Sequence, residues 1–65
     1  MPLVTIEGPV IKDTEKKRQL VKDITETVAD SYEFPKETIV VLLKENSPEN
    51  VGVGGQLVID LSKLE

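Results

Sequence analysis

The feature that most constrains this sequence is a run of apolar residues in the middle of a short chain. The run from Thr38 to Leu43 is rich in β-branched side chains and apolar at successive positions, which is typical of a strand buried on both faces. The chain has only 65 residues. A domain of that size buries only about 60% of the surface of its unfolded form. The strand therefore needs more cover than one copy of the chain can supply.

Composition leaves oligomerisation as the remaining source of stability. The sequence contains neither Cys nor His, which excludes disulfides and nearly excludes structural zinc, and no metal or cofactor is expected. Eight Lys and Arg against 12 Asp and Glu give a net charge of −4, which disfavours nucleic acid and anionic membranes as partners. No segment resembles a signal peptide or reaches the length of a membrane span. We expect a cytoplasmic homo-oligomer.

The sequence predicts a strand, a long helix and a second strand. Residues 3–7 are mostly β-branched or apolar, and the turn signal Gly8-Pro9 ends this strand. The helix begins at an N-cap, Asp13 or Thr14, and runs to about Ser31. Its apolar stripe recurs at helical spacing. The members of that stripe are Leu20, Val21, Ile24 and Val28.

A strand, a helix and a second strand form a βαβ unit, whose right-handed crossover makes the two strands parallel. Phe34-Pro35 ends the helical segment, and Thr38 to Leu43 forms the second strand. Residues 46–50 are expected to form a loop, and residues 51–55 a tight hairpin or bulge. The stretch Gln56 to Leu64 is a short strand, a helical turn or an arm on a neighbouring subunit. Residues 1–65 are thus expected to form a single α/β domain with a C-terminal hairpin or arm, assembled into oligomers.

The inventory of reactive groups excludes most catalytic machinery. Without His or Cys, the serines have no imidazole base and no thiolate is available. The glycines of residues 52–55 lack the Lys-Ser/Thr of a phosphate-binding loop. Proline is acceptable at the start of an edge strand, but Pro2 would carry a free secondary amine if Met1 were removed. Partial burial and a nearby cation, such as Lys12, would suit that amine to act as a base near neutral pH.

Several landmarks together resemble the 4-oxalocrotonate tautomerase family. They are Pro2-Leu3-Val4-Thr5-Ile6, the βαβ pattern, Pro35 ahead of the second strand and Gly52-Val53-Gly54-Gly55 after it. The resemblance extends from Pro2 to about Leu57. It implies a homohexamer, a trimer of dimers whose sheets join into four strands. It also implies that an amino-terminal proline moves a proton between carbons of an enol or dienol acid, such as a 2-hydroxymuconate-like compound.

Three other positions of the family carry different residues in this chain. Lys12 stands where well-known members have an arginine that binds a substrate carboxylate, and Lys offers a point charge without the bidentate fork. Val40 stands where a second arginine polarises the substrate carbonyl, and Val51 where an aromatic side chain forms a pocket wall. The chain's only arginine, Arg18, is expected on the solvated side of the helix.

The sequence therefore predicts a tautomerase acting on small enol or dienol acids, with Pro2 as general base and Lys12 as carboxylate anchor. The missing second arginine leaves open what stabilises the developing negative charge. One alternative is a different proline-dependent reaction, either hydration with loss of halide or decarboxylation. The other is a tautomerase-like assembly module with only incidental activity, which the residues at positions 40 and 51 suggest.

Overall fold

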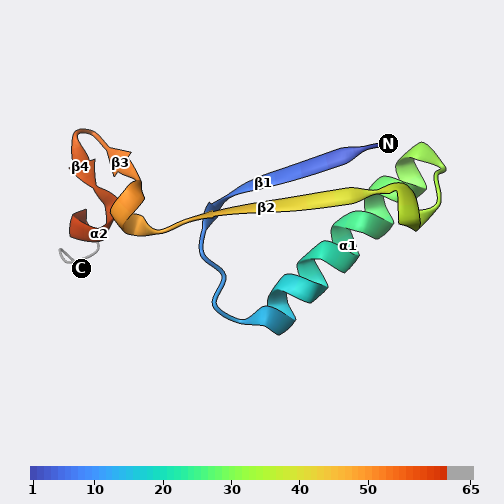
Figure 1. Cartoon of the computed structure of the whole chain (residues 1–65), viewed down its shortest axis with the longest axis horizontal. Coiled ribbons are helices and arrows are strands. Elements are labelled where there is room, and N and C mark those ends of the chain that lie inside the picture. Colours follow the sequence, from blue (N-terminus) through green and yellow to red (C-terminus); the bar gives the residue numbers. More distant parts are fainter. Residues whose placement is uncertain (62–65) are drawn as a thin grey trace.

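The computed structural model describes residues 1–61 and has the predicted βαβ core (Figure 1). Strand β1 spans Leu3–Pro9, helix α1 spans Thr14–Tyr32 and strand β2 spans Val40–Asn46. The two strands pair in parallel, with Leu3 opposite Val40 and Pro9 opposite Asn46. A short 3₁₀ helix, η1 (Lys36–Thr38), connects α1 to β2. The predicted fold class, parallel pairing and long helix are confirmed.

Helix α1 begins and ends with satisfied caps. The side chain of Asp13 accepts a hydrogen bond from the Glu15 N–H at 2.9 Å, which confirms the predicted N-cap. At the other end Glu33 adopts the left-handed conformation, with φ of 58°, and the Phe34 N–H donates to the Ala29 carbonyl oxygen at 3.0 Å. Arg18 pairs with Glu15 on the exposed side of the helix, as expected of a surface residue.

Helix α1 covers one face of the sheet and leaves the other open (Figure 1). Side chains alternate along both strands between half-buried positions under the helix and exposed positions on the open face. The open face carries large apolar residues, with Leu3 61% exposed and Leu42 44% exposed. Within residues 1–61 α1 covers one face of β2, and the other face is left for another subunit, as the sequence led us to expect.

Both strands are longer than predicted. Strand β1 continues through Gly8-Pro9, which was expected to end it, because a proline at the last position of an edge strand costs no ladder hydrogen bond. Strand β2 begins at Val40 and continues past the predicted end at Leu43 to Asn46. The predicted loop of residues 46–50 therefore includes the last residue of the strand. Beyond Ser47 that segment is a 3₁₀ helix, η2 (Pro48–Asn50), rather than a loop.

The C-terminal segment forms a small arm at the far end of the sheet. The predicted hairpin is present: β3 (Gly52–Val53) pairs antiparallel with β4 (Gln56–Leu57). Its turn has positive φ at both Gly54 (61°) and Gly55 (84°), which glycine adopts without steric cost. A short helix, α2 (Val58–Leu61), follows. The part of the predicted arm after residue 61 lies outside the described residues.

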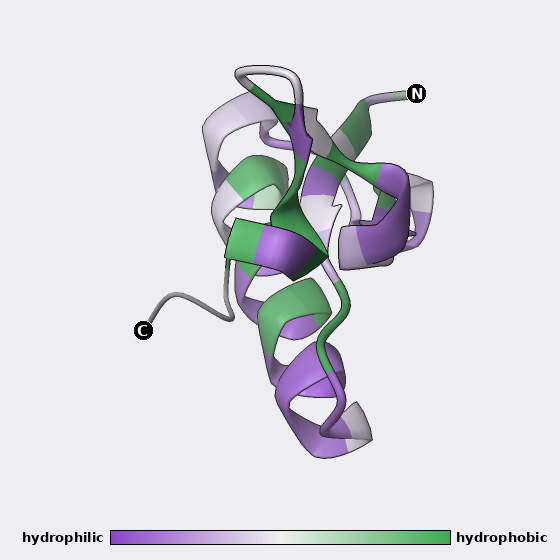
Figure 2. Ribbon diagram, turned by 90° about the vertical axis from the view of Figure 1, so that its left-hand side faces the viewer, coloured by the Kyte–Doolittle hydropathy of each residue, from purple (hydrophilic) through white to green (hydrophobic). Residues whose placement is uncertain are grey.

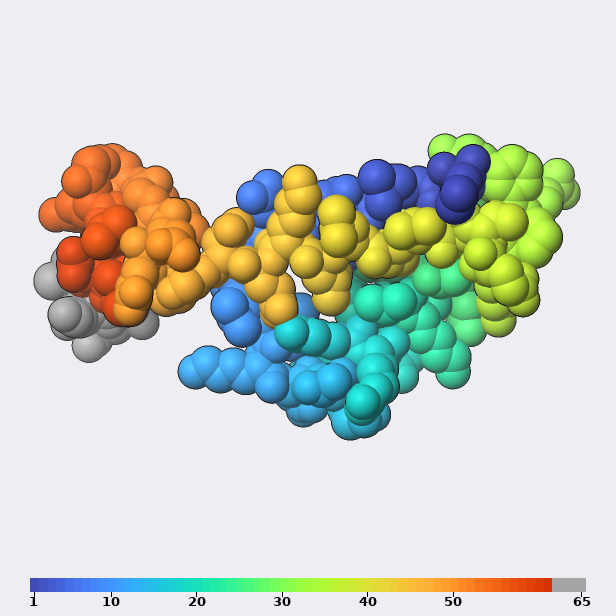
Figure 3. All heavy atoms as spheres, in the orientation of Figure 1, coloured from blue at the N-terminus to red at the C-terminus, as the bar shows by residue number. Residues whose placement is uncertain are grey.

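The single chain is far from compact. Its radius of gyration is 15.4 Å, whereas a globular chain of this length has about 11 Å. Figure 3 shows the arm joined to the rest of the chain by one narrow segment. Among the described residues only Ala29 and Ile39 are buried hydrophobics, and Figure 2 shows hydrophilic residues over much of α1. These dimensions support the expectation that copies of the chain stabilise one another.

Candidate functional site

Pro2 lies immediately before β1, at the end of the sheet where β2 also begins. Its ring is half-buried, and its carbonyl oxygen accepts a hydrogen bond from the Val40 N–H at 3.1 Å. This bond extends the parallel ladder by one step and fixes the backbone on the carbonyl side of Pro2. The structure thus brings together two of the four residues that the sequence singled out, Pro2 and Val40.

A cavity of about 390 Å³ adjoins this end of the sheet. Met1, Phe34, Glu37 and Thr38 line it. Met1 is joined to the Pro2 nitrogen, so the cavity is lined by the residue next to the proposed base. Sequence reasoning missed Phe34 and Glu37 as candidate site residues, because Phe34-Pro35 indicated only the end of a helix and Glu37 was one of many surface carboxylates. Both residues lie near Met1 because η1 brings the chain back to the start of the sheet. No pattern in the local sequence predicts this proximity.

Lys12 and Val51 lie at the opposite end of the sheet. Lys12 follows the last residue of β1, and Val51 follows β2. A seven-residue strand separates its two ends by about 20 Å at the usual rise per residue. No side chain spans that distance, so Lys12 and Pro2 of one chain cannot touch the same small molecule.

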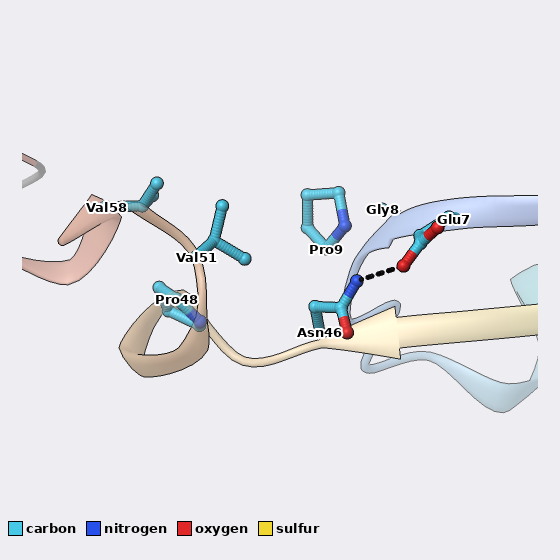
Figure 4. Close-up of a pocket in the computed structure, with 7 residues that line it drawn as sticks. All are labelled: Glu7, Gly8, Pro9, Asn46, Pro48, Val51 and Val58. Carbon is cyan, nitrogen blue, oxygen red and sulfur yellow. Dashed lines mark hydrogen bonds between the residues drawn. The ribbon is translucent and has the colours of Figure 1, made fainter. Parts of the chain in front are cut away.

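Val51 lines a second, mostly apolar cavity of about 520 Å³ (Figure 4). In Figure 4 Pro48, Val51 and Val58 of the arm face Pro9 and the ends of the two strands. The Asn46 amide donates to the Glu7 carboxylate at 3.2 Å on the strand side of the cavity. Val51 is thus a cavity wall, but of a cavity at the end of the sheet away from Pro2.

The Glu45 carboxylate organises the backbone next to Lys12. One of its oxygens lies 2.5 Å from the Lys17 Nζ, and the other accepts a hydrogen bond from the Ile11 N–H at 2.6 Å. The hydrogen bond from Lys17, followed by that from Ile11, lowers the pKa of the Glu45 carboxyl below its usual value of 4.5. Lys12 itself is exposed and forms no ion pair within residues 1–61. The loop thus presents a free ammonium group on an anchored backbone.

The arrangement offers proline chemistry at one end of the sheet and a cation at the other. Within the described residues, no group of three Asp or Glu side chains could hold a metal ion. No helix in residues 1–61 is long and apolar enough to cross a membrane. An acid–base reaction on an anionic molecule is the chemistry that these side chains can carry, provided that two copies of the chain bring opposite ends of their sheets together.

Comparison with known proteins agrees with this fold. Residues 2–61 match the family described as "Tautomerase enzyme". A probable tautomerase of Listeria monocytogenes serotype 4b is 42% identical over 55 residues, which cover 85% of this chain and 90% of the relative. A 2-hydroxymuconate tautomerase of Bacillus subtilis is 33% identical over 61 residues, covering 94% and 98% of the two chains.

Solved structures show the same architecture. A crystal structure of a 4-oxalocrotonate tautomerase homologue superposes with a TM-score of 0.85 at 30% identity, covering 92% of this chain and 95% of the other. The structure of DmpI from Archaeoglobus fulgidus is 39% identical, with a TM-score of 0.77, and covers 91% of this chain and 100% of its own. These similarities extend over both the βαβ core and most of the arm.

Proposed function

The chain belongs to the tautomerase family, among the homologues of 4-oxalocrotonate tautomerase, and we propose that it isomerises small enol or dienol acids with Pro2 as general base. The observation that carries this proposal is the position of Pro2. A half-buried proline lies immediately before β1 with its carbonyl oxygen held by the Val40 N–H, and Met1, which is joined to its nitrogen, lines a cavity. Removal of Met1 would turn that nitrogen from an amide into a secondary amine.

The proposed reaction moves one proton and needs no other reactant. The neutral amine of Pro2 takes the proton of the substrate's enol hydroxyl, and as the oxygen forms a carbonyl the π electrons move along the conjugated chain to a carbon. The same amine then gives the proton to that carbon, which forms the new C–H bond and regenerates the free base. The negative charge that develops between these steps requires stabilisation, which Lys12, a backbone N–H or an ordered water would supply.

A complete site requires more than one subunit under this proposal. Pro2 and Val40 would come from one chain, and Lys12 from a second chain whose opposite sheet end lies against the first. The open face of the sheet, with Leu3 and Leu42 exposed, is the surface that such assembly would cover. We propose a hexamer built from dimers, in which each chain acts as a single domain.

The test compares matched preparations of the same oligomer that differ only in Met1. Mass spectrometry first establishes which sample begins at Pro2, and light scattering establishes that the two samples assemble alike. With a 2-hydroxymuconate-like dienol acid as substrate, the processed sample is expected to isomerise it and the Met1-retained sample to be inactive, because an amide nitrogen has no useful basicity. Equal turnover by the two samples would refute the role of the Pro2 amine.

A second candidate is an assembly module with incidental activity. It is favoured by Val40, an apolar residue hydrogen-bonded to Pro2 at a position where the family resemblance implies an arginine that polarises the substrate carbonyl. This candidate predicts that the processed oligomer turns over enol acids no faster than a general amine buffer of equal concentration. Hydration with loss of halide or decarboxylation, the other proline-dependent reactions, would instead release halide or carbon dioxide from unsaturated acids in the same assay.

A further inference from the structure

The segment between β1 and α1 carries Lys12 and lies beyond the end of the strand ladder. The parallel pairing stops at Pro9 and Asn46, and residues 10–13 have no regular secondary structure. The Lys12 side chain is exposed and forms no ion pair within residues 1–61. The backbone of this segment therefore determines where the Lys12 ammonium lies, and whatever holds that backbone also places the cation.

Glu45 holds the backbone on one side of Lys12. Its carboxylate accepts a hydrogen bond at 2.6 Å from the N–H of Ile11, a residue 34 positions away in the sequence. In the ladder Glu45 stands opposite Gly8, so its side chain carries the connection between β2 and the first segment beyond the last paired residues. An ionised carboxylate binds an N–H more strongly than a neutral oxygen does. The residue before Lys12 is thus tied firmly to β2.

Asp13 holds the backbone on the other side of Lys12. Its side chain accepts a hydrogen bond from the Glu15 N–H at 2.9 Å, and its carbonyl oxygen accepts one from the Lys17 N–H at 3.2 Å. The side chain of Lys17 extends to β2, where its Nζ lies 2.5 Å from the second Glu45 oxygen. One residue of α1 therefore connects both anchors, and Lys12 lies between two residues whose positions are fixed.

The pair of Lys17 and Glu45 also keeps the charge of Lys12 available. Both paired side chains are largely covered, at 30% and 23% exposure. The negative charge of Glu45 is thus offset at close range by Lys17. A carboxylate on a ligand then meets the unpaired ammonium of Lys12 without competition from this glutamate.

We propose that Glu45 is a positioning residue, which fixes through the Ile11 N–H the backbone that places the Lys12 ammonium in a neighbouring subunit's site. Lys17 in turn fixes the orientation of the Glu45 carboxylate. This inference rests on the proposed function, in which Lys12 binds a substrate carboxylate next to the Pro2 of another chain. Glu45 acts without touching the substrate, so its effect is confined to the binding of acids.

The experiment compares the native processed oligomer with Glu45→Met, which has no acceptor for the Ile11 N–H. With a 2-hydroxymuconate-like dienol acid, the variant should raise KM about tenfold and leave kcat within about threefold, because a misplaced ammonium weakens binding of the carboxylate. The KM of a neutral enol aldehyde should stay within about twofold of the native value. Glu45→Gln keeps a neutral acceptor and should raise the KM of the acid only about threefold.

Glu26→Met is the matched control. It removes the ion pair between Glu26 of α1 and Lys36, with 3.6 Å between the carboxylate oxygen and Nζ. This pair also joins α1 to another element, but it lies at the opposite end of the helix from Lys12. Glu26→Met should therefore leave the KM of both substrates within about twofold of the native value.

A double-mutant cycle tests whether Glu45 acts through Lys12. The Lys12→Ala background has no ammonium to place, so Glu45→Met should there change the KM of the acid less than about twofold. Adipate, an unreactive diacid of the same chain length, gives the same comparison without turnover. Calorimetry should show that Glu45→Met weakens adipate binding about tenfold when Lys12 is present and less than about twofold when it is absent.

Three outcomes would overturn the inference. The first is an equal loss on the acid and the neutral enol, which would indicate a structural role. The second is persistence of the Glu45→Met effect in the Lys12→Ala background. The third is an assembled Glu45→Met oligomer with native KM and native adipate binding. If light scattering shows that Glu45→Met does not assemble, the same cycle is run with Glu45→Gln, and a KM effect that is absent or independent of Lys12 overturns the inference.

Failure of the proposed function gives a different result. A native processed protein that binds adipate through Lys12 but isomerises no enol acid would contradict the proposed activity. The adipate cycle would still report whether Glu45 places the Lys12 ammonium, so the two failures are distinguishable.

Discussion

The backbone N–H of Val40 donates to the carbonyl oxygen of Pro2 across 3.1 Å, so the proposed base and the valine at the position where the family resemblance implies an arginine are fixed as neighbours. The contact uses only main-chain atoms. Substitution of the Val40 side chain therefore leaves this contact possible, and the position can be changed without moving Pro2.

Val40→Arg is expected to raise turnover of a 2-hydroxymuconate-like diacid by about tenfold or more, because a guanidinium near the carbonyl oxygen would stabilise its developing charge. Val40 lies on the open face and is 42% exposed in the single chain, so light scattering first establishes that Val40→Arg assembles like the native protein. Steady-state kinetics of the processed protein measure the effect, and Val40→Met is the uncharged control. No gain from a folded Val40→Arg oligomer would contradict the missing-electrophile explanation.

Lys12→Ala is expected to lower kcat/KM for acidic substrates by roughly one to two decades, since it removes a charge-assisted hydrogen bond worth about 1.5–3 kcal/mol. Neutral enols should be nearly unaffected. The comparison requires kinetics with one acidic and one neutral substrate on the same preparation. If every acidic substrate is turned over as before, Lys12 is not the carboxylate anchor.

Mixed oligomers test whether Lys12 acts in a neighbour's site. Met1-retained chains and Lys12→Ala chains are each deficient, but refolding them together should restore about a quarter of the native sites if assembly is random, because each site draws on two chains. Chains that supply both groups to their own site would show no such recovery. Mass spectrometry of the mixture checks the proportions.

Leu42→Glu is expected to abolish the oligomer, because Leu42 lies on the open face of the sheet and burying an unpaired carboxylate there is costly. Sedimentation should show a hexamer for the native protein and a largely unfolded monomer for the variant. The native melting temperature should rise with protein concentration. Lys22→Glu, at an exposed position of α1, is the control for charge reversal on the helix side and should leave the oligomer intact. A stable folded Leu42→Glu monomer at micromolar concentration would contradict the prediction that the chain needs the oligomer to stay folded.

The Glu45 carboxylate should make stability depend on acid pH. Its pKa is lowered in the folded chain, so its contribution is fully present above the usual value of 4.5 and is lost as the pH falls through the lower folded value. Thermal melting from pH 7 down to pH 3 should therefore show a steeper decline for the native protein than for Glu45→Gln. Lys17→Met removes the main cause of the shift and should also flatten the decline. Parallel curves for all three proteins would show that the contact has no such effect.

The sequence predicted the elements of the fold better than their ends. Asp13 was a visible N-cap, and the glycines at 54 and 55 were a visible hairpin turn, because both signals are local. The end of β2 was missed because its last residues are polar. Glu45 is polar, yet it belongs to the strand because its carboxylate pairs with Lys17 and accepts a hydrogen bond from the Ile11 N–H. These partners are distant in sequence, so no local pattern predicts the contacts.

The candidate site was harder to predict for a reason of topology. Spacing along a sequence indicates which residues follow a strand, but not which copy of the chain supplies each group. Pro2 and Lys12 are ten positions apart, yet a whole strand separates them. Phe34 and Met1 are far apart in sequence, yet both line one cavity because η1 returns the chain to the start of the sheet.

The two-stranded sheet also matters before assembly, while a newly made chain is still alone. Each strand then has one edge with no neighbour, and such edges can recruit any extended segment as readily as the correct partner. Productive docking therefore competes with aggregation during synthesis. Glu7 and Lys44, opposite each other in the ladder and exposed, place charges in the middle of the apolar open face. Wrongly stacked chains would have to bury these charges unpaired, which is energetically costly and disfavours such stacking.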